Sequence, residues 1–99
     1  MINILVDDNK IEISGHANSN SPGHDLVCCA VTTIIYSCNA WFKEEDINFK
    51  EEPKIPRITL TIKNINQKNQ NLICLVAKQL KYISEAYPKY VKYDKNTKI

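Results

Sequence analysis

The chain lacks a long apolar run, a basic N-terminal segment and a strong net charge. No apolar stretch approaches the roughly 18 residues that a membrane-spanning helix needs. The opening MINILVDDNK reaches two acids before any basic residue, which is unlike a secretory signal. The net charge of +2 is too small to indicate a nucleic-acid partner. We therefore expect a cytoplasmic protein with no membrane association and no direct nucleic-acid binding.

The composition excludes neither catalysis nor binding, but it argues against disorder and against a fibrous fold. Hydrophobic residues make up 43% and charged residues 24% of the chain, which are ordinary globular values. A length of 99 residues suits one small core, so we expect a single domain over residues 1–99. The four cysteines are expected to be reduced in the cytoplasm. Catalysis, metal binding and core packing are open to each of them.

Glycine is scarce, and both glycines lie in one short segment. That segment, GHANSNSPGHDLVCC over residues 15–29, also holds both histidines and two of the four cysteines. A thiol close to an imidazole can act as a nucleophile or bind a metal. Gly15 and Gly23 bracket a loop and are candidate hinges for its movement. The chemistry of the protein is therefore predicted to lie in this segment.

Alternating apolar residues predict two pairs of strands, and apolar residues at helical spacing predict two helices. Strands are expected over residues 2–6, 11–13, 47–49 and 58–62, helices from Asp25 to about Phe42 and from about Gln67 to a stop at Pro88, and a short edge strand over residues 90–93. The order ββαββα, with a possible C-terminal strand, favours a two-layer α+β sandwich. Its sheet of four or five strands is expected to be antiparallel or mixed, because hairpins connect the strands.

The first predicted helix carries three of the four cysteines. At about 100° per residue its apolar positions centre on Ile34 and Cys38, so Cys38 is expected in the core. Cys28 lies at the edge of this apolar stripe, in the first turn, where backbone N–H groups and the helix dipole stabilise an anion. Cys29 projects about 100° away from Cys28, and the spacing ranks it only a little lower as a reactive thiol. Cys74 is expected at the surface of the second helix.

His16 follows a predicted strand and could serve as general base to Cys28, with Asp25 as an orienting acid one turn before the thiol. Two other interpretations fit the same spacing. His16 and Cys28 can be an ordinary loop histidine and a half-buried small residue. Alternatively, a tetrahedral zinc ion could be held by four nearby ligands, namely His16, His24, Cys28 and Cys29. Against zinc, the adjacent thiols point apart and no C-x-x-C spacing is present.

The segment contains a longer pattern, which consists of Gly15-His16-Ala17, then Gly23, Asp25, Val27-Cys28, Ala30-Val31 and Thr32. This pattern resembles that of the ribosomal-processing cysteine proteases called Prp, which runs Gly-His-Ala, a short loop, then Gly-x-Asp-x-Val-Cys-Ala-Ala-Val-Ser. The length, the order of elements and the late Tyr-Pro-Lys-Tyr-Val at residues 87–91 are also similar. Two positions depart from the pattern, because Cys29 replaces an alanine and Thr32 a serine.

The resemblance implies a cysteine endopeptidase that removes the N-terminal extension of a large-subunit ribosomal protein. Cys28 falls on the nucleophile of the family and His16 on its base. Asp25 falls on the acid near the thiol, and Thr32 supplies a hydroxyl one turn after the cysteine. The resemblance further implies a homodimer and a loop that closes over the substrate. We expect no cofactor and no metal.

A protein of a different class remains an alternative, namely a non-enzymatic ribosome-associated or RNA-binding module. Its phosphate contacts would come from a basic patch, which consists of Lys81, Lys89, Lys92, Lys95 and Lys98. An ordinary solvated surface also accounts for these lysines. Peptidase activity separates the two alternatives.

Overall fold

Five strands form one mixed sheet in the computed structural model, which describes residues 1–15, 26–52, 54 and 56–96. The strands are β1 (Ile2–Val6), β2 (Lys10–Ser14), β3 (Ile47–Glu52), β4 (Arg57–Ile62) and β5 (Val91–Lys95). Their order across the sheet is β3-β4-β2-β1-β5, and every pair is antiparallel except β1 with β5. The predicted C-terminal strand is therefore present at a sheet edge, over Val91–Lys95 rather than residues 90–93.

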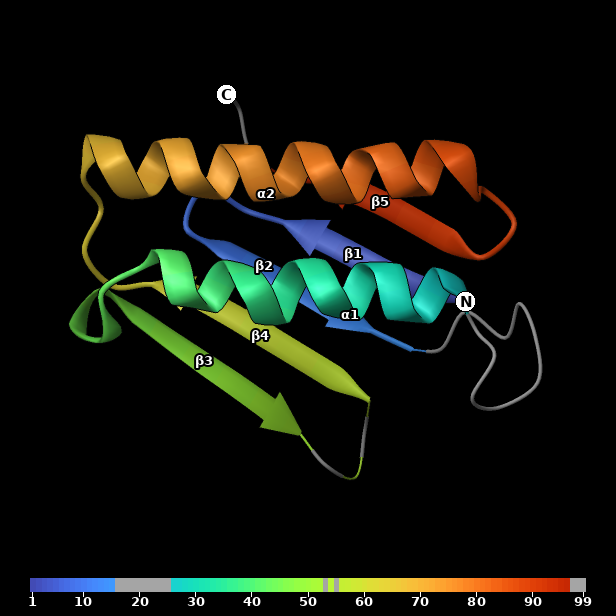
Figure 1. Cartoon of the computed structure of the whole chain (residues 1–99), viewed down its shortest axis with the longest axis horizontal. Helices are drawn as coiled ribbons and strands as arrows, with labels where there is room; N and C mark the ends of the chain where they lie inside the picture. Colours follow the sequence, from blue (N-terminus) through green and yellow to red (C-terminus); the bar gives the residue numbers. More distant parts are fainter. Residues whose placement is uncertain (16–25, 53, 55, 97–99) are drawn as a thin grey trace.

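Two helices cover one face of this sheet (Figure 1). They are α1 (Leu26–Cys38), which is followed by the short 3₁₀ turns η1 (Asn39–Trp41) and η2 (Glu44–Asp46), and α2 (Gln67–Ala86). The order ββαββαβ confirms the predicted two-layer α+β sandwich with a mixed sheet. Among the described residues, no helix has the length and apolar character needed to cross a bilayer.

The inner face of the sheet is built from alternating apolar residues. The buried residues of β1 and β2 alternate with more exposed ones, and they are Ile2, Ile4, Val6, Ile11 and Ile13. Between the two strands the chain reverses through Asp8 and Asn9, where the Asp7 N–H donates to the Lys10 carbonyl oxygen at 2.8 Å. Because side chains along a strand alternate between faces, each strand presents one apolar face to the helices.

The helix α2 lies between two clear boundary signals. The Asn66 side chain accepts a hydrogen bond from the Asn69 N–H at 2.8 Å, which is an N-cap. Pro88 follows the last turn and cannot continue a helix. The buried face is formed by Asn69, Ile73, Val76, Ala77, Leu80 and Ile83. Two apolar residues at the same helical spacing are not part of this face, since Leu72 is only half-buried and Tyr87 is exposed.

The helix α1 is shorter than the sequence predicts, and its buried face is shifted by one residue. It ends at Cys38 instead of near Phe42, and η1 follows. Phe42 is buried from an extended backbone, a conformation that a continuing helix would not allow. Trp41 is exposed. The fully buried positions are Val27, Val31, Ile35 and Cys38, so the apolar face centres on Ile35 and not on Ile34.

A polar cluster, in which Asp46 and Asn69 are buried and Asn64 is exposed, connects η2 to the turn before α2 and to the first turn of that helix. The Asp46 carboxylate accepts from Asn69 Nδ2 and from Asn64 Nδ2, each at 3.1 Å. The Asp46 carbonyl oxygen accepts from the Lys63 N–H at 2.7 Å. Hydrogen bonds from Asn69 and Asn64 stabilise the carboxylate and lower the pKa of Asp46. This cluster holds the end of the sheet where β3 begins and β4 ends.

Candidate active site

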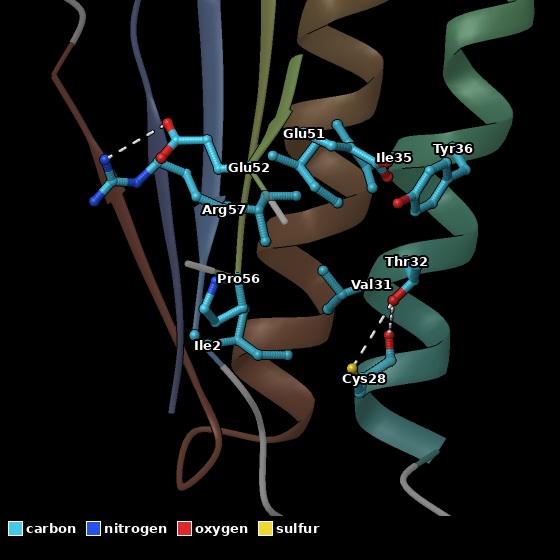
Figure 2. A pocket seen from close by; sticks show the side chains of 13 residues that line it. Ile2, Cys28, Val31, Thr32, Ile35, Tyr36, Glu51, Glu52, Pro56 and Arg57 are labelled. Carbon is cyan, nitrogen blue, oxygen red and sulfur yellow. Dashed lines mark hydrogen bonds and ion pairs between the residues drawn. The ribbon is translucent and has the colours of Figure 1, made fainter. Parts of the chain in front are cut away.

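A pocket of about 540 Å³ lies between α1 and the inner face of the sheet. It is at the end of the sheet where β1 and β4 begin and where β2 and β3 end (Figure 2). The lining residues are Ile2, Ile13, Gly15, Cys28, Val31, Thr32, Ile35, Tyr36, Glu51, Glu52, Pro56, Arg57 and Ile58. Apolar walls with a few polar groups are typical of ligand-binding sites.

Cys28 presents its thiol to this pocket from the first turn of α1 (Figure 2). The residue is half-buried and packs against the edge of the core, as the helical spacing predicts. Its Sγ lies 3.9 Å from Thr32 Oγ1, one turn further along the helix. The Thr32 hydroxyl donates to the Cys28 carbonyl oxygen. The hydroxyl of Thr32 thus connects the thiol with the backbone of the same helical turn.

The first turn of α1 also supplies backbone donors next to the thiol. The N–H groups at the start of an α-helix have no carbonyl partner within the helix, and α1 begins at Leu26, two residues before the thiol. The positive end of the helix dipole adds to their effect on a nearby anion. A substrate oxyanion bound beside the thiol would be stabilised at this position.

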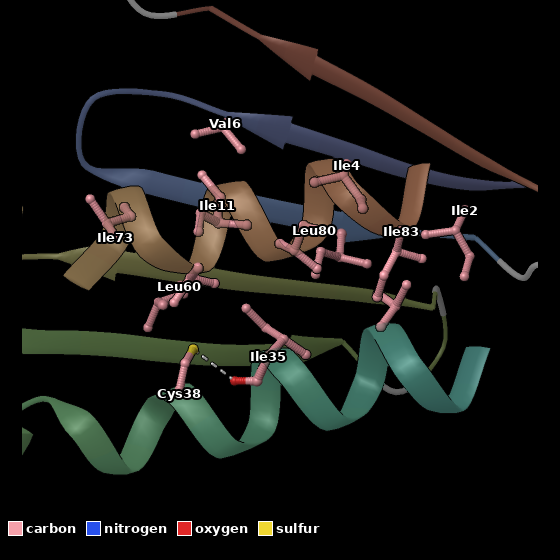
Figure 3. Packing of buried hydrophobic residues seen from close by; sticks show 14 of the residues in the cluster. Ile2, Ile4, Val6, Ile11, Ile35, Cys38, Leu60, Ile73, Leu80 and Ile83 are labelled. Carbon is pink, nitrogen blue, oxygen red and sulfur yellow. Dashed lines mark hydrogen bonds between the residues drawn. The ribbon is translucent and has the colours of Figure 1, made fainter. Parts of the chain in front are cut away.

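The other three cysteines lie elsewhere. Cys29 is exposed, with its Sγ 4.0 Å from Thr33 Oγ1, and it does not line the pocket. Cys38 is in the core as predicted, where its Sγ donates to the Ile35 carbonyl oxygen at 3.1 Å (Figure 3). Burial raises the pKa of Cys38 to about 11. Cys74 is exposed on α2, also as predicted. The structure thus separates Cys28 from Cys29, which the spacing alone does not.

Gly15 lines the pocket and has a backbone conformation that requires glycine. Its φ is +89°, in the region that side chains disfavour. A Cβ at this position would collide with the Met1 carbonyl oxygen. The Gly15 N–H also donates to the Pro56 carbonyl oxygen at 2.9 Å. The close approach of three chain segments therefore accounts for glycine here, whether or not the residue also acts as a hinge.

Four predicted site residues, His16, Gly23, His24 and Asp25, lie outside the described residues. The pairing of Cys28 with His16, the orienting role of Asp25 and the hinge at Gly23 therefore stay predictions. Within the described residues, no group of three or more His, Cys, Asp or Glu side chains is placed to hold a metal ion. The zinc interpretation depends on both histidines and stays untested.

The sequence reasoning missed the wall of the pocket opposite α1. The end of β3 and the start of β4, with the residue before it, form that wall, through Glu51, Glu52, Pro56, Arg57 and Ile58. The one signal available in the sequence is Glu51. It continues the inward positions of Ile47 and Phe49 with a charged residue where a core strand would carry an apolar one.

Arg57 carries the positive charge of this wall, and two carboxylates balance it. Its Nε lies 3.0 Å from Glu12 Oε1 and its Nη1 4.0 Å from Glu52 Oε1. The Nε–H is buried and has no acceptor in line among the described residues, so the contact with Glu12 is ionic rather than a well-formed hydrogen bond. The guanidinium is thus held by neighbouring acids.

A half-buried thiol that faces an apolar pocket from a helix N-terminus is the arrangement that a cysteine-dependent enzyme requires. Comparison with known proteins shows which family of cysteine-dependent enzymes the chain resembles. The family model described as cysteine protease Prp matches residues 1–92. The ribosomal processing cysteine protease Prp of Mycoplasma pneumoniae is 31% identical over 98 residues, which cover 99% of this chain and 98% of that protein. The chain belongs to the Prp family of ribosomal processing cysteine proteases.

Further relatives agree with this assignment. The ribosomal processing cysteine protease Prp of Mycoplasma genitalium is 32% identical over 91 residues, or 92% of each chain. The crystal structure of Prp from S. aureus with a covalently linked product peptide has a TM-score of 0.85 at 19% identity and covers 97% of this chain and 100% of that one. This last likeness shows that the fold is shared.

Proposed function

We propose that this chain removes the N-terminal extension of a large-subunit ribosomal protein, with Cys28 as the nucleophile and His16 as general base and acid. One observation carries the choice of nucleophile. Of the four cysteines, all within the described residues, Cys28 alone lines the 540 Å³ pocket. Membership of the Prp family supports the substrate class.

The proposed reaction has two stages. His16 takes the proton of Cys28, and the sulfur attacks the carbonyl carbon of the scissile peptide bond. The resulting oxyanion is held by backbone N–H groups of the α1 first turn or of the loop before it. The carbon–nitrogen bond then breaks, and His16 protonates the leaving amine. In the second stage His16 takes a proton from water, which attacks the thioester and releases the new carboxylate and the thiol.

The supporting residues follow from the same scheme. Thr32 gives the sulfur a hydrogen-bonding neighbour, because its Oγ1 lies 3.9 Å from Sγ. Asp25 orients the imidazole of His16. Gly15 and Gly23 act as hinges of the loop that closes over the substrate. A thiol, an imidazole and water complete the reaction, so we propose no cofactor or metal. We further propose that the protein is a cytoplasmic homodimer, in keeping with a role in ribosomal processing.

The structure does not favour the RNA-binding alternative. Lys81 Nζ lies 4.0 Å from Glu85 Oε1, and Lys92 Nζ lies 3.8 Å from Asp94 Oδ2. Acids therefore balance part of the basic patch described above. Of the three tyrosines near it, Tyr90 and Tyr93 pack against the core. We do not propose a nucleic acid as a direct partner.

The proposal is tested by incubating the protein with tagged large-subunit ribosomal proteins that retain their N-terminal extensions. We expect Cys28→Ala to lower kcat/KM at least about 10³-fold, and His16→Ala to have an effect of similar size. Cys29→Ala is the matched control, because it removes a thiol from the same helical turn outside the pocket. It should stay within about twofold of the unmodified protein.

Two results would contradict the proposal. Cleavage that survives in Cys28→Ala but is lost in Cys29→Ala would show that Cys29, and not Cys28, is the nucleophile. Cleavage that is abolished by a chelator and resists iodoacetamide would favour the zinc interpretation. Circular dichroism on each variant confirms that the loss of activity is not a loss of fold.

A further inference from the structure

One wall of the pocket carries a carboxylate at a position where the strand pattern calls for an apolar side chain. In the edge strand β3, Ile47 is buried and Phe49 is half-buried, and both face the helices. Glu51 occupies the next position on the same face, because side chains on one face recur every second residue. It pairs with Ile58 of β4 in the sheet register. Glu51 therefore projects from the inner face of the sheet, toward α1 (Figure 2).

The surroundings leave this carboxylate available to a ligand. Glu51 is exposed and lines the pocket, and in the part of the chain that the structure describes it forms no ion pair. The one cation among the residues that line the pocket, Arg57, is already paired with Glu12 and Glu52. The other walls of the pocket are mostly apolar, with the Thr32 hydroxyl and Tyr36 on α1. Of the two acids that line the pocket, Glu52 pairs with Arg57, so Glu51 is the one that an extended peptide would meet without a cation beside it.

The distance from Glu51 to the Cys28 thiol corresponds to a few peptide residues. The rings of Tyr36 and Phe49 are in contact, with centroids 5.6 Å apart. Figure 2 shows Glu51 beside Ile35 of α1, about two helical turns from Cys28. At about 1.5 Å per helical residue, the thiol therefore lies roughly 10 Å back along α1. About three extended residues, at about 3.3 Å each, cover that span.

We propose that Glu51 is a specificity residue, which binds a lysine or arginine side chain of the substrate within three residues of the scissile bond. An aliphatic stem would pack on the apolar walls while its cationic end pairs with the carboxylate. This inference rests on the proposed function, since it takes Cys28 as the point of attack. It adds a charge preference that the reaction itself does not require.

The test compares peptides that span the cleaved bond and differ at one position. Lysine or glutamate is placed in turn at each of the three positions on either side of the bond, and kcat/KM is measured for each pair. We expect lysine to be preferred about tenfold over glutamate at one of these positions, as attraction is exchanged for repulsion at a partly exposed site. Raising the salt concentration should reduce the preference. Glu51→Gln should abolish it, and Glu51→Lys should reverse it.

The control is Glu45→Lys, which makes the same change of charge at an exposed residue of η2, at the opposite end of β3. It should leave the preference of the unmodified protein in place. An equal preference in the unmodified protein and in Glu51→Lys at every position would overturn the inference while cleavage persists. Absence of cleavage of every peptide by the folded protein would instead count against the proposed function. Because Glu51 is exposed, both variants are expected to fold, and thermal melts verify this.

Discussion

The two ends of the β3–β4 hairpin both carry acidic side chains, but the acids have different roles. At one end Asp46 is 7% exposed and accepts hydrogen bonds from Asn64 and Asn69. At the other end Glu51 is exposed and borders the pocket. The carboxylate of Asp46 is used in hydrogen bonds within the protein, whereas that of Glu51 is available to a ligand. Burial and partners, rather than residue type, decide which acid can act on a substrate.

The helix α1 connects these two ends and carries a thiol at each. Cys28 lies in its first turn, at the end that holds the pocket, which we call the open end. Cys38 is its last residue, near the end that holds Asp46, which we call the closed end. Cys38 is fully buried, whereas Cys28 lines the pocket. In Figure 1, α1 and β3 diverge toward the end where α1 begins. The packed closed end thus holds α1 in place, and the open end of the same helix carries the reactive groups.

The largest difference that we expect between the two ends is in thiol reactivity. Burial raises the pKa of Cys38 to about 11. At pH 8 such a thiol is about one part in a thousand thiolate, against about a quarter for an ordinary cysteine. Iodoacetamide should therefore modify Cys38 in the folded protein at least about 100-fold more slowly than Cys29 or Cys74, as followed by mass spectrometry. Equal rates would show that Cys38 is not protected by burial.

Substitutions in the polar cluster at the closed end should lower the free energy of unfolding more than a substitution of Glu51 at the open end. Asn69 is 1% exposed and donates to Asp46 and to the Asn64 carbonyl oxygen. Asn69→Ala removes both of these hydrogen bonds, although Asn64 still donates to Asp46, and it should lower the free energy of unfolding by about 2 kcal/mol, measured by urea denaturation. Gln70→Ala, at the exposed neighbour on α2, should change it by less than about 0.5 kcal/mol. A Glu51→Ala variant as destabilised as Asn69→Ala would remove the contrast between the ends.

At the open end, the hydroxyl beside the thiol should affect activity. Thr32→Val keeps the shape and removes the oxygen, so we expect kcat/KM to fall about tenfold, the equivalent of one hydrogen bond. Thr32→Ser restores the hydroxyl and should recover activity to within about twofold. Thr33→Val is the matched control, because its hydroxyl lies beside the exposed Cys29. A Thr33→Val variant as impaired as Thr32→Val would show that the hydroxyl near Cys28 has no special role.

The smallest expected effect is the acid sensitivity of the closed end. Hydrogen bonds from Asn69 and Asn64 lower the pKa of Asp46 from its ordinary value of 3.8. A lowered folded-state pKa contributes stability that is complete above the unfolded value and is lost as the pH falls through the folded one. Stability should therefore decrease below about pH 4. Asn69→Ala should flatten this decrease in denaturation curves at pH 5 and pH 3, and an unchanged slope would exclude Asp46 as a contributor.

The regular elements could be predicted from the sequence because their signals are local. The alternation of Ile2, Ile4 and Val6 is enough to predict a strand with one buried face. Pro88 similarly marks the end of α2. The end of α1 could not be predicted in this way, because Trp41 continues the apolar spacing but is exposed in the fold. What ends the helix is the burial of Phe42 from an extended backbone, a tertiary effect.

The candidate site could be predicted in part. The spacing placed Cys28 at the edge of the core, and the motif resemblance singled it out from Cys29. The pocket could not be predicted, since its walls come from α1 and from four strands that are distant in sequence. Glu51 interrupts an apolar pattern, but only the packing of α1 beside β3 reveals that this carboxylate and the thiol line the same pocket.

The order of strands and helices, the reactive residue types in residues 15–29 and the family can all be read from the sequence. These follow from local periodicity and from a contiguous motif, which require no knowledge of the distant chain. Tertiary structure alone decided which of two adjacent thiols faces a cavity and which carboxylate is buried by asparagines. Both depend on residues far apart in the chain coming together, and side-chain exposure is a property of that packing rather than of any short segment.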